Sequence, residues 1–339
     1  MKAFYITDKF ETSFGDVPIP EISADEVLLK VAYVGLCGSD LNTYRGLNPM
    51  VTLPRIPGHE IGAVIEKTGA KVSKEWNAGM NVTISPYTSC GSCSSCLAER
   101  PNCCRYNQTM GVQRNGALTE YIAVPWTKLF AAKNLSLKEL ALVEPFTVGN
   151  HAADRGKITE DDVVAVFGCG AVGLGAVFGA AAKGATVIAI DIDDEKLSMA
   201  KLAGAQHAVN SQNENLHNKL QALTESKGPN VVIEAVGLRA TFRAAVDEAA
   251  FAGRVVYIGY AKQPVEYETK YFVQKELDIC GSRNADAVNF RRVINLFGKN
   301  NFPIEKLISK VYSFKDAGAA LKDWDADPSR ITRILIEIA

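Results

Sequence analysis

The fold of this 339-residue chain is decided by one stretch, Val163-Val164-Ala165-Val166-Phe167-Gly168-Cys169-Gly170-Ala171-Val172-Gly173. An apolar, β-branched strand runs into a Gly-x-Gly-x-x-Gly turn that opens an Ala-rich helical segment. The first glycine makes the turn, the second lets the backbone approach a pyrophosphate, and the third lets helix and strand pack closely. The helix N-terminus then holds the anion. The predicted coenzyme-binding residues of this turn are Gly168, Gly170, Ala171, Val172 and Gly173.

The next apolar run ends in an acid suited to a ribose. Residues 186–190 are followed by Asp191, 18 residues after Gly173 (191 − 173). A carboxylate there can bind the ribose hydroxyls and repels a 2′-phosphate, and Asp193 and Asp194 add negative charge. The sequence therefore favours NAD over NADP. The alternative is a structural α/β domain without coenzyme.

Beyond residue 160, continuous apolar runs alternate with helical patterns, which indicates a parallel sheet covered on both faces. The predicted strands are 163–167, 186–190, 231–236, 255–258 and 277–280. Residues 163–182 carry no charge, yet five glycines interrupt them. Because glycine weakens helix interiors, a buried strand, turn and helix explain this stretch better than a membrane span.

The first 150 residues differ, reading as short strands and loops punctuated by proline. Strands are predicted at 26–34, 61–66 and 79–84. The tail from residue 286 predicts a helix at 290–297 and a final strand at 331–338, expected to pack back onto the first domain. The predicted domains are therefore residues 1–150 with 286–339, and residues 151–285. The fold class is α/β.

Four cysteines of the first domain have the spacing of a structural metal site. Cys90, Cys93 and Cys96 are separated by two-residue gaps, and Cys104 follows. Such gaps turn neighbouring thiolates toward one centre, and a fourth thiolate completes a tetrahedron around Zn²⁺. A closed structural zinc site is predicted.

The same domain offers a second set of ligands in distant loops: Cys37, His59 with Glu60, and Glu144. A lone cysteine or histidine is usually an ordinary core or surface residue. Three protein ligands that leave one position open, however, are the pattern of a catalytic zinc. Two zinc ions per chain, one structural and one catalytic, are therefore expected.

Together these motifs resemble the zinc-dependent medium-chain alcohol dehydrogenases, close to the sorbitol (polyol) dehydrogenase branch. The resemblance runs over essentially the whole chain and includes Gly-Leu-Cys-Gly-Ser-Asp at 35–40, Gly-His-Glu at 58–60 and Glu144-Pro145. It implies a GroES-like, mainly-β catalytic domain, a doubly wound Rossmann domain that binds NAD, an active site between the two domains, and a homodimer or homotetramer joined partly through Rossmann edge strands.

The resemblance also implies particular site residues. Glu144 matches the third catalytic ligand of polyol dehydrogenases, whereas some relatives use the glutamate after the histidine, here Glu60; which one binds at rest stays open. Ser39 is a candidate proton relay, with Tyr44 a second candidate or a substrate contact. Arg283 and Asn284, in a Gly-Ser-Arg-Asn segment, are candidate substrate contacts beside Glu144.

The implied reaction is oxidation of a secondary alcohol of a polyol or a sugar acid (aldonate). A Zn²⁺ ion lowers the pKa of bound water to about 7, so a metal is expected to assist deprotonation. L-Threonine 3-dehydrogenase and sugar-alcohol-phosphate dehydrogenase activities are the alternatives. A zinc-free quinone reductase would lack the ligands, and a nucleic-acid-binding zinc module would need a basic face.

Composition is compatible with these expectations. The formal net charge is −1, which gives no reason to expect nucleic acid or a membrane as partner. Eight cysteines, four of them in metal-like spacing, indicate a reducing environment rather than a disulfide scaffold. The N-terminus lacks the apolar core of a signal peptide. A cytoplasmic location is expected.

Overall fold

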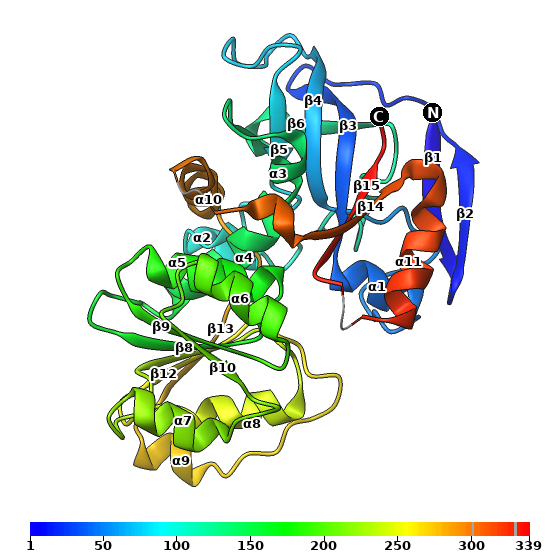
Figure 1. Cartoon of the computed structure of the whole chain (residues 1–339). Coiled ribbons are helices and arrows are strands. Elements are labelled where there is room, and N and C mark those ends of the chain that lie inside the picture. Colours follow the sequence, from blue (N-terminus) through cyan, green and yellow to red (C-terminus); the bar gives the residue numbers. More distant parts are fainter. Residues whose placement is uncertain (300–301, 329–330) are drawn as a thin grey trace. The chain divides into compact units, whose positions relative to one another are not determined.

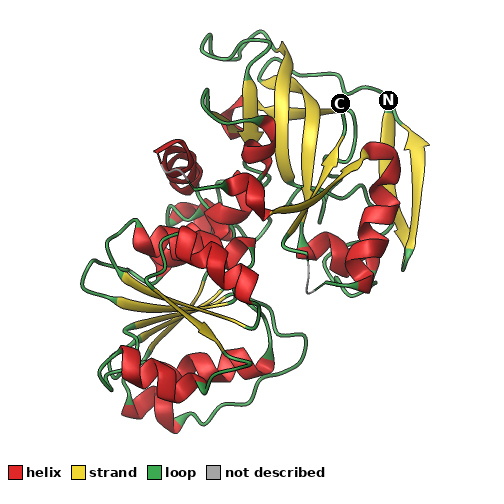
Figure 2. Ribbon diagram, in the orientation of Figure 1, coloured by secondary structure: helices red, strands yellow, loops and turns green. Residues whose placement is uncertain are grey.

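The computed structural model describes residues 1–299, 302–328 and 331–339. The chain forms two compact units: unit 1 comprises Met1–Glu144 with Phe290–Ala339, and unit 2 comprises Pro145–Asn289. Unit 1 is mainly β, and unit 2 is an open sheet with helices on both faces (Figure 2). The predicted α/β fold class is confirmed. The division lies within the first turns of two helices, α4 (Val143–Arg155) and α10 (Ala287–Lys299), whereas the sequence placed it after residues 150 and 285.

Among its described residues, unit 1 contains a sheet of seven strands in the order β14-β15-β3-β4-β5-β7, with β6 paired to β3 (Figure 1). A separate hairpin joins β1 to β2. These strands are β1 (Lys2–Asp8), β2 (Glu11–Asp16), β3 (Glu26–Leu36), β4 (Glu60–Thr68), β5 (Asn81–Ile84), β6 (Tyr121–Pro125), β7 (Leu129–Ala131), β14 (Ile308–Ser313) and β15 (Arg333–Glu337).

The central strand β3 shows why these residues form a sheet. Val27, Leu29 and Val31 are fully buried and alternate with more exposed neighbours, which is the period of a strand with one face in the core. The C-terminal strand β15 pairs antiparallel with β3, so residues about 300 positions apart lie on neighbouring strands. This pairing brings Arg333 to the strand that carries Gly35 and Leu36.

Short helices connect the strands of unit 1. The α-helices that lie wholly in this unit are α1 (Gly38–Tyr44), α2 (Ser94–Leu97), α3 (Leu137–Ala141) and α11 (Ala317–Ala326). The 3₁₀ turns are η1 (Pro101–Cys103), η2 (Trp126–Lys128), η3 (Ile304–Leu307) and η4 (Phe314–Asp316).

Unit 2 is a six-stranded parallel sheet in the order β10-β9-β8-β11-β12-β13. The chain starts at β8 in the middle, runs outward to β10, and returns to build the other half from β11. The carboxyl ends of β8 and β11 therefore form the switch point at which such sheets bind ligands. The strands are β8 (Val163–Phe167), β9 (Thr186–Asp191), β10 (His207–Asn210), β11 (Val231–Glu234), β12 (Arg254–Tyr257) and β13 (Asp278–Gly281).

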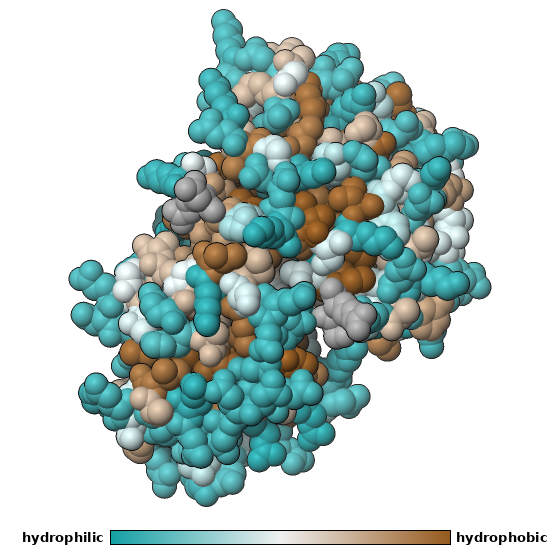
Figure 3. All heavy atoms as spheres, viewed as in Figure 1, coloured by the Kyte–Doolittle hydropathy of each residue, from teal (hydrophilic) through white to brown (hydrophobic). Residues whose placement is uncertain are grey.

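Helices cover both faces of this sheet. They are α5 (Ala171–Ala181), α6 (Asp194–Leu202), α7 (Leu216–Leu223), α8 (Arg239–Glu248) and α9 (Lys270–Gln274). Figure 2 shows α5 and α6 on one face and α7, α8 and α9 on the other. Figure 3 shows mostly hydrophilic side chains over the outer surface of α7 and α9. The apolar strands are thus buried between the two helical layers, as their sequence pattern predicts.

The uncharged stretch at 163–182 is β8, the glycine turn and α5. A Cβ atom on Gly175 would lie 2.5 Å from the Phe146 carbonyl oxygen, and one on Gly179 would lie 2.9 Å from the Asn150 amide nitrogen. These glycines therefore allow α5 to pack closely against α4. No helix in the described part of the chain combines the length and apolar character needed to cross a membrane.

Candidate functional site

Three side chains of unit 1 form one buried group of potential metal ligands. Cys37 caps the N-terminus of α1, Glu60 is the first residue of β4, and His59 directly precedes it. The Sγ atom of Cys37, a ring nitrogen of His59 and a carboxylate oxygen of Glu60 all lie within 4.8 Å of one another. His59 and Glu60 are buried, and Cys37 is half-buried. The start of helix α1 and the start of strand β4 thus lie next to each other.

Asp40 ties these two chain segments together. Its Oδ2 accepts a hydrogen bond of 2.8 Å from the backbone N–H of Cys37, and its Oδ1 accepts one of 3.3 Å from the backbone N–H of Gly58. Asp40 is buried, and burial raises the pKa of its carboxyl. The carboxylate fixes the residues next to both Cys37 and His59, so the spacing of the group is set by the fold.

Glu60 is held by an arginine that reaches it from two strands away. Arg333 Nη1 donates hydrogen bonds of 2.6 Å to Glu60 Oε1 and 2.8 Å to the Leu36 carbonyl. The intervening strand leaves room because Gly35, opposite Glu60, has no side chain; a Cβ there would lie 2.3 Å from Glu60 Oε2. Burial raises the pKa of Glu60 to about 7, even though the charge of Arg333 opposes the shift.

Two potential metal-ligand atoms of the group make no hydrogen bond within the described part of the chain. Within the described residues, His59 Nδ1 and Glu60 Oε2 are buried and have no hydrogen-bond partner. Burial alone would lower the pKa of His59, but a hydrogen bond with Cys37 and the charge of that thiolate raise it well above its usual value. Buried polar atoms normally find partners, so these two atoms indicate a ligand-binding site. One thiol, one imidazole and one carboxylate fit Zn²⁺.

Glu144 lies beside this group and is not one of its three members. It stands in the first turn of α4, is buried, and accepts a hydrogen bond on Oε1 from the hydroxyl of Tyr87. Its charge acts on both His59 and Glu60. Of the two glutamates that the sequence left open, the structure brings Glu60 together with Cys37 and His59.

The two remaining candidates of this domain lie on α1. Ser39 Oγ is buried and has no partner in the described part of the chain, so it is available to a ligand hydroxyl. The Tyr44 ring instead packs edge-on against Phe10, with 5.3 Å between centroids, and belongs to the hydrophobic core of unit 1. The relay by Ser39 and the substrate contact by Tyr44 remain predictions.

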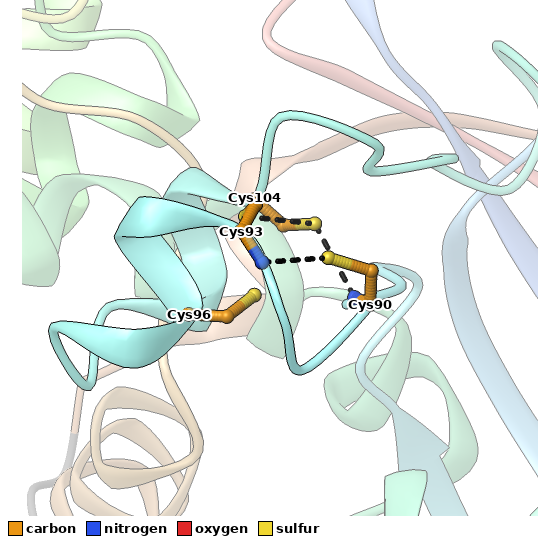
Figure 4. A group of neighbouring side chains, drawn as sticks. All are labelled: Cys90, Cys93, Cys96 and Cys104. Carbon is orange, nitrogen blue, oxygen red and sulfur yellow. Dashed lines mark hydrogen bonds between the residues drawn. The ribbon is translucent and has the colours of Figure 1, made fainter.

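The four cysteines of the second cluster converge as their spacing predicts. Cys90, Cys93, Cys96 and Cys104 point toward one another (Figure 4), with all four sulfur atoms within 4.8 Å of one another. Backbone N–H groups of Cys90 and Cys93 point at the sulfurs of Cys104 and Cys90, each at 3.3 Å. A hydrogen bond with Ser95 lowers the pKa of Cys93 to about 5. N–H groups aimed at sulfur favour thiolates, so this donor set also fits Zn²⁺.

The glycine turn of unit 2 has the geometry of a dinucleotide site. Gly168 has φ +90°, which favours glycine, and a Cβ on Gly173 would lie 1.7 Å from the Gly168 carbonyl. A Cβ on Gly170, in contrast, would meet nothing within 4 Å. Gly170 caps α5, and Ala171 and Val172 open that helix. Gly168 and Gly173 are therefore required by the fold, whereas Gly170 leaves its backbone open to a ligand.

Asp191 ends β9 beside this turn. Its Oδ2 accepts a hydrogen bond of 2.7 Å from the Cys169 N–H, and its Oδ1 accepts one of 2.8 Å from the Ile192 N–H. The carboxylate is thus oriented at the carboxyl end of the strand, next to the glycines. Arg283 and Asn284 follow β13; Arg283 is exposed, and Asn284 has φ 54°. Their substrate contacts remain predictions.

Comparison with known proteins identifies the family. Residues 23–134 match the alcohol dehydrogenase GroES-like domain, and residues 171–299 match the zinc-binding dehydrogenase domain. A zinc-type alcohol dehydrogenase-like protein of Haemophilus influenzae is 33% identical over 94% of this chain and 93% of its own length. The chain belongs to the zinc-type alcohol dehydrogenase family.

Two relatives of the chain are named as dehydrogenases of polyhydroxylated compounds. L-galactonate-5-dehydrogenase of Escherichia coli is 30% identical over 88% of this chain and 87% of its own length. Sorbitol dehydrogenase of Bacillus subtilis is 34% identical over 83% of this chain and 81% of its own length.

Solved structures of family members share the fold of this chain. The rspB alcohol dehydrogenase of E. coli CFT073, complexed with NADH, superimposes with a TM-score of 0.89 at 32% identity, covering 100% of this chain and 99% of that one. Galactitol-1-phosphate dehydrogenase of E. coli has a TM-score of 0.91 at 29% identity, with both chains covered completely.

Sequence reasoning assigned no role to four residues that shape the surroundings of Cys37, His59 and Glu60: Gly35, Asp40, Tyr87 and Arg333. Asp40 carried a signal, because it stands three residues after Cys37 at a capping-box position of α1. Arg333 carried a weaker one, as a charged residue inside an apolar strand. Nothing in the sequence pattern links Tyr87 to Glu144, because that contact exists only in the folded chain.

Proposed function

We propose that this protein oxidises a secondary alcohol of a polyol or sugar acid, with NAD as hydride acceptor and zinc at the group Cys37–His59–Glu60. The observation that carries the proposal is a pair of buried potential metal-ligand atoms, His59 Nδ1 and Glu60 Oε2, that have no hydrogen-bond partner among the described residues and lie beside the Cys37 thiol. The same chain holds an open glycine turn with an oriented aspartate. A bound zinc would act as a Lewis acid on the alcohol, and NAD would accept the hydride.

The protein's own residues set up this chemistry. Cys37, His59 and Glu60 supply three ligand atoms from chain segments that Asp40 and Arg333 fix in place. Ser39 is proposed to relay the alcohol proton: its unpartnered hydroxyl accepts that proton while it passes its own proton on. Glu144 is proposed to bind a substrate hydroxyl beside the group. On unit 2, Gly170 is proposed to admit the pyrophosphate and Asp191 to bind the adenosine ribose and disfavour NADP.

The substrate class is proposed from the relatives. Sorbitol and L-galactonate dehydrogenases suggest a neutral polyol or an aldonate. A sugar-alcohol phosphate is a second candidate, because galactitol-1-phosphate dehydrogenase superimposes over its full length. L-Threonine 3-dehydrogenase activity remains the alternative from another substrate class.

Assembly and location are proposed on more general grounds. A homodimer or homotetramer is proposed because β13 is an edge strand whose Ile279 is 40% exposed, and such edges are templates for pairing. A cytoplasmic location is proposed because all eight cysteines are free thiols, four of them in a metal-like cluster.

The experiment is a substrate screen of the zinc-loaded protein. Polyols, aldonates, alditol phosphates and L-threonine are each offered with NAD and with NADP, and formation of the reduced coenzyme is measured. The proposal predicts turnover of a polyol or an aldonate with NAD. Turnover confined to an alditol phosphate or to threonine would select the corresponding alternative. No turnover of any alcohol by protein with both metal groups filled would contradict the proposal.

A further inference from the structure

The inference concerns Tyr87 and rests on the proposed catalytic zinc group. We propose that Tyr87 is a positioning residue: its hydroxyl holds the Glu144 carboxylate outside the group Cys37–His59–Glu60, so that Glu60 is the resting carboxylate ligand.

The position of Tyr87 is fixed by its loop. The residue lies between β5 and the four-cysteine cluster and is 6% exposed, and its hydroxyl donates to Glu144 Oε1. The next residue, Thr88, is held through its N–H by Asn107 Oδ1 at 3.0 Å and through its hydroxyl by the Gln108 N–H at 2.7 Å. A ring anchored in this way presents its hydroxyl to Glu144 from a defined direction.

The two glutamates are held by different partners. Glu60 is fully buried and bonded to the Arg333 guanidinium, and the absence of a side chain at Gly35 gives its carboxylate the space it occupies. Glu144, 4% exposed, is bonded to a neutral phenol. One carboxylate is therefore fixed within the group, and the other is retained beside it.

Charge explains why this separation matters. One thiolate and one carboxylate together neutralise a divalent cation. A second carboxylate would leave the buried group with net negative charge, and it would fill the open position that a catalytic zinc needs. The Tyr87 hydroxyl keeps that position open. Without it, the Glu144 carboxylate loses the hydrogen bond that Tyr87 donates, and a cation at the neighbouring group attracts that carboxylate into the open position.

The test uses the full chain loaded with Co²⁺, whose visible absorption band responds to the number and kind of ligands. Tyr87→Phe is expected to change the band of the catalytic group and to slow the removal of that ion by a chelator, because Glu144 then adds a fourth protein ligand. Tyr312→Phe is the matched control. Tyr312 lies on β14, is 9% exposed, and donates a hydrogen bond of 2.5 Å to the carboxylate of Asp323. Tyr312→Phe should leave the absorption band of the catalytic group unchanged.

Two further variants make the test decisive. Glu144→Gln in the otherwise unchanged protein should keep the wild-type band, because Glu144 is not a resting ligand. An altered band in this variant would overturn the proposal. This measurement tests the proposal even if Tyr87→Phe fails to fold. The double variant Tyr87→Phe with Glu144→Ala should restore the wild-type band. A wild-type band in Tyr87→Phe, or an altered band in the double variant, also overturns it.

Metal content separates this inference from the proposed function. Wild-type protein that binds one Co²⁺ per chain, with that ion at the four-cysteine cluster, lacks the catalytic site, and then both proposals fail. Wild-type protein that binds two, with a band that Tyr87→Phe leaves unchanged, retains the proposed function and refutes the role of Tyr87 alone.

Discussion

Replacing Gly35 by alanine tests how the catalytic group is built. The new Cβ atom would lie 2.3 Å from Glu60 Oε2 and 3.0 Å from Glu60 Cβ. Since carbon and oxygen rarely approach closer than about 3.3 Å, the carboxylate must move by about 1 Å. A shift of that size would lengthen the present 2.6 Å contact between Arg333 and Glu60 beyond hydrogen-bond range. Gly35→Ala should therefore disturb both the ligand and its anchor.

The expected result is a selective loss of one metal. Because overpacking a core costs about 1–3 kcal/mol, Gly35→Ala should still fold, with a lower melting temperature. Its affinity for the ion at Cys37, His59 and Glu60 should fall by about 10–100-fold, the usual effect of disturbing a ligand's surroundings. The four-cysteine cluster should keep its ion.

The assay is zinc release to a chelator of known affinity, with Gly38→Ala as control. Gly38 stands on α1 beside Cys37, and a Cβ there would meet nothing within 4 Å. Gly38→Ala should therefore retain both ions, and alanine should favour the helix by about 0.5–1 kcal/mol. Wild-type zinc affinity in Gly35→Ala would refute the reasoning.

Three further predictions follow from the same geometry. Gly170→Ala should keep the wild-type melting temperature but weaken NADH binding, measured by fluorescence titration, at least about tenfold (about 1.4 kcal/mol), whereas Gly173→Ala should lower the melting temperature; the reverse order would contradict the dinucleotide site. Cys93→Ser should bind one zinc instead of two and melt at a lower temperature, because structural zinc contributes folding free energy; unchanged metal content and stability would exclude a structural zinc at this cluster. In metal-free protein, burial raises the pKa of Glu60 from 4.5 to about 7, so its stabilising contribution is complete below the unfolded-state pKa and is lost as pH rises through about 7. The free energy of unfolding should fall over this range, and Glu60→Gln should remove most of the fall; an identical pH dependence in this variant would contradict the assignment.

The sequence predicted features that depend on local patterns. Strands β8 and β9, the glycine turn and Asp191 form one contiguous stretch, in which strand, turn and acid follow at fixed spacing. The four cysteines likewise lie within fifteen residues (90–104), so their convergence needed little information from the rest of the chain. In both cases the chemistry and the local geometry are set by the same few residues.

Contacts between segments that are distant in sequence could not be predicted from these local patterns. The choice between Glu60 and Glu144 depends on Arg333, on the space beside Gly35, and on Tyr87, each placed by the packing of unit 1. The hairpin of β1 and β2 was also not predicted, because β2 is largely exposed and lacks a clear apolar alternation. Tyr44 shows the opposite case: it stands near Cys37 in sequence, yet its ring lies in the hydrophobic core.

The most direct test of zinc-dependent hydride transfer is stepwise reconstitution. Metal-free protein is titrated with zinc in the presence of NAD and the polyol or aldonate that the screen selects, and NADH formation is measured against bound zinc. The four-cysteine cluster should fill first, since four thiolates make the tighter site. NADH formation is then predicted to appear only as the second equivalent binds. A full rate with one zinc or none would contradict the assignment of Cys37, His59 and Glu60 as the catalytic metal group.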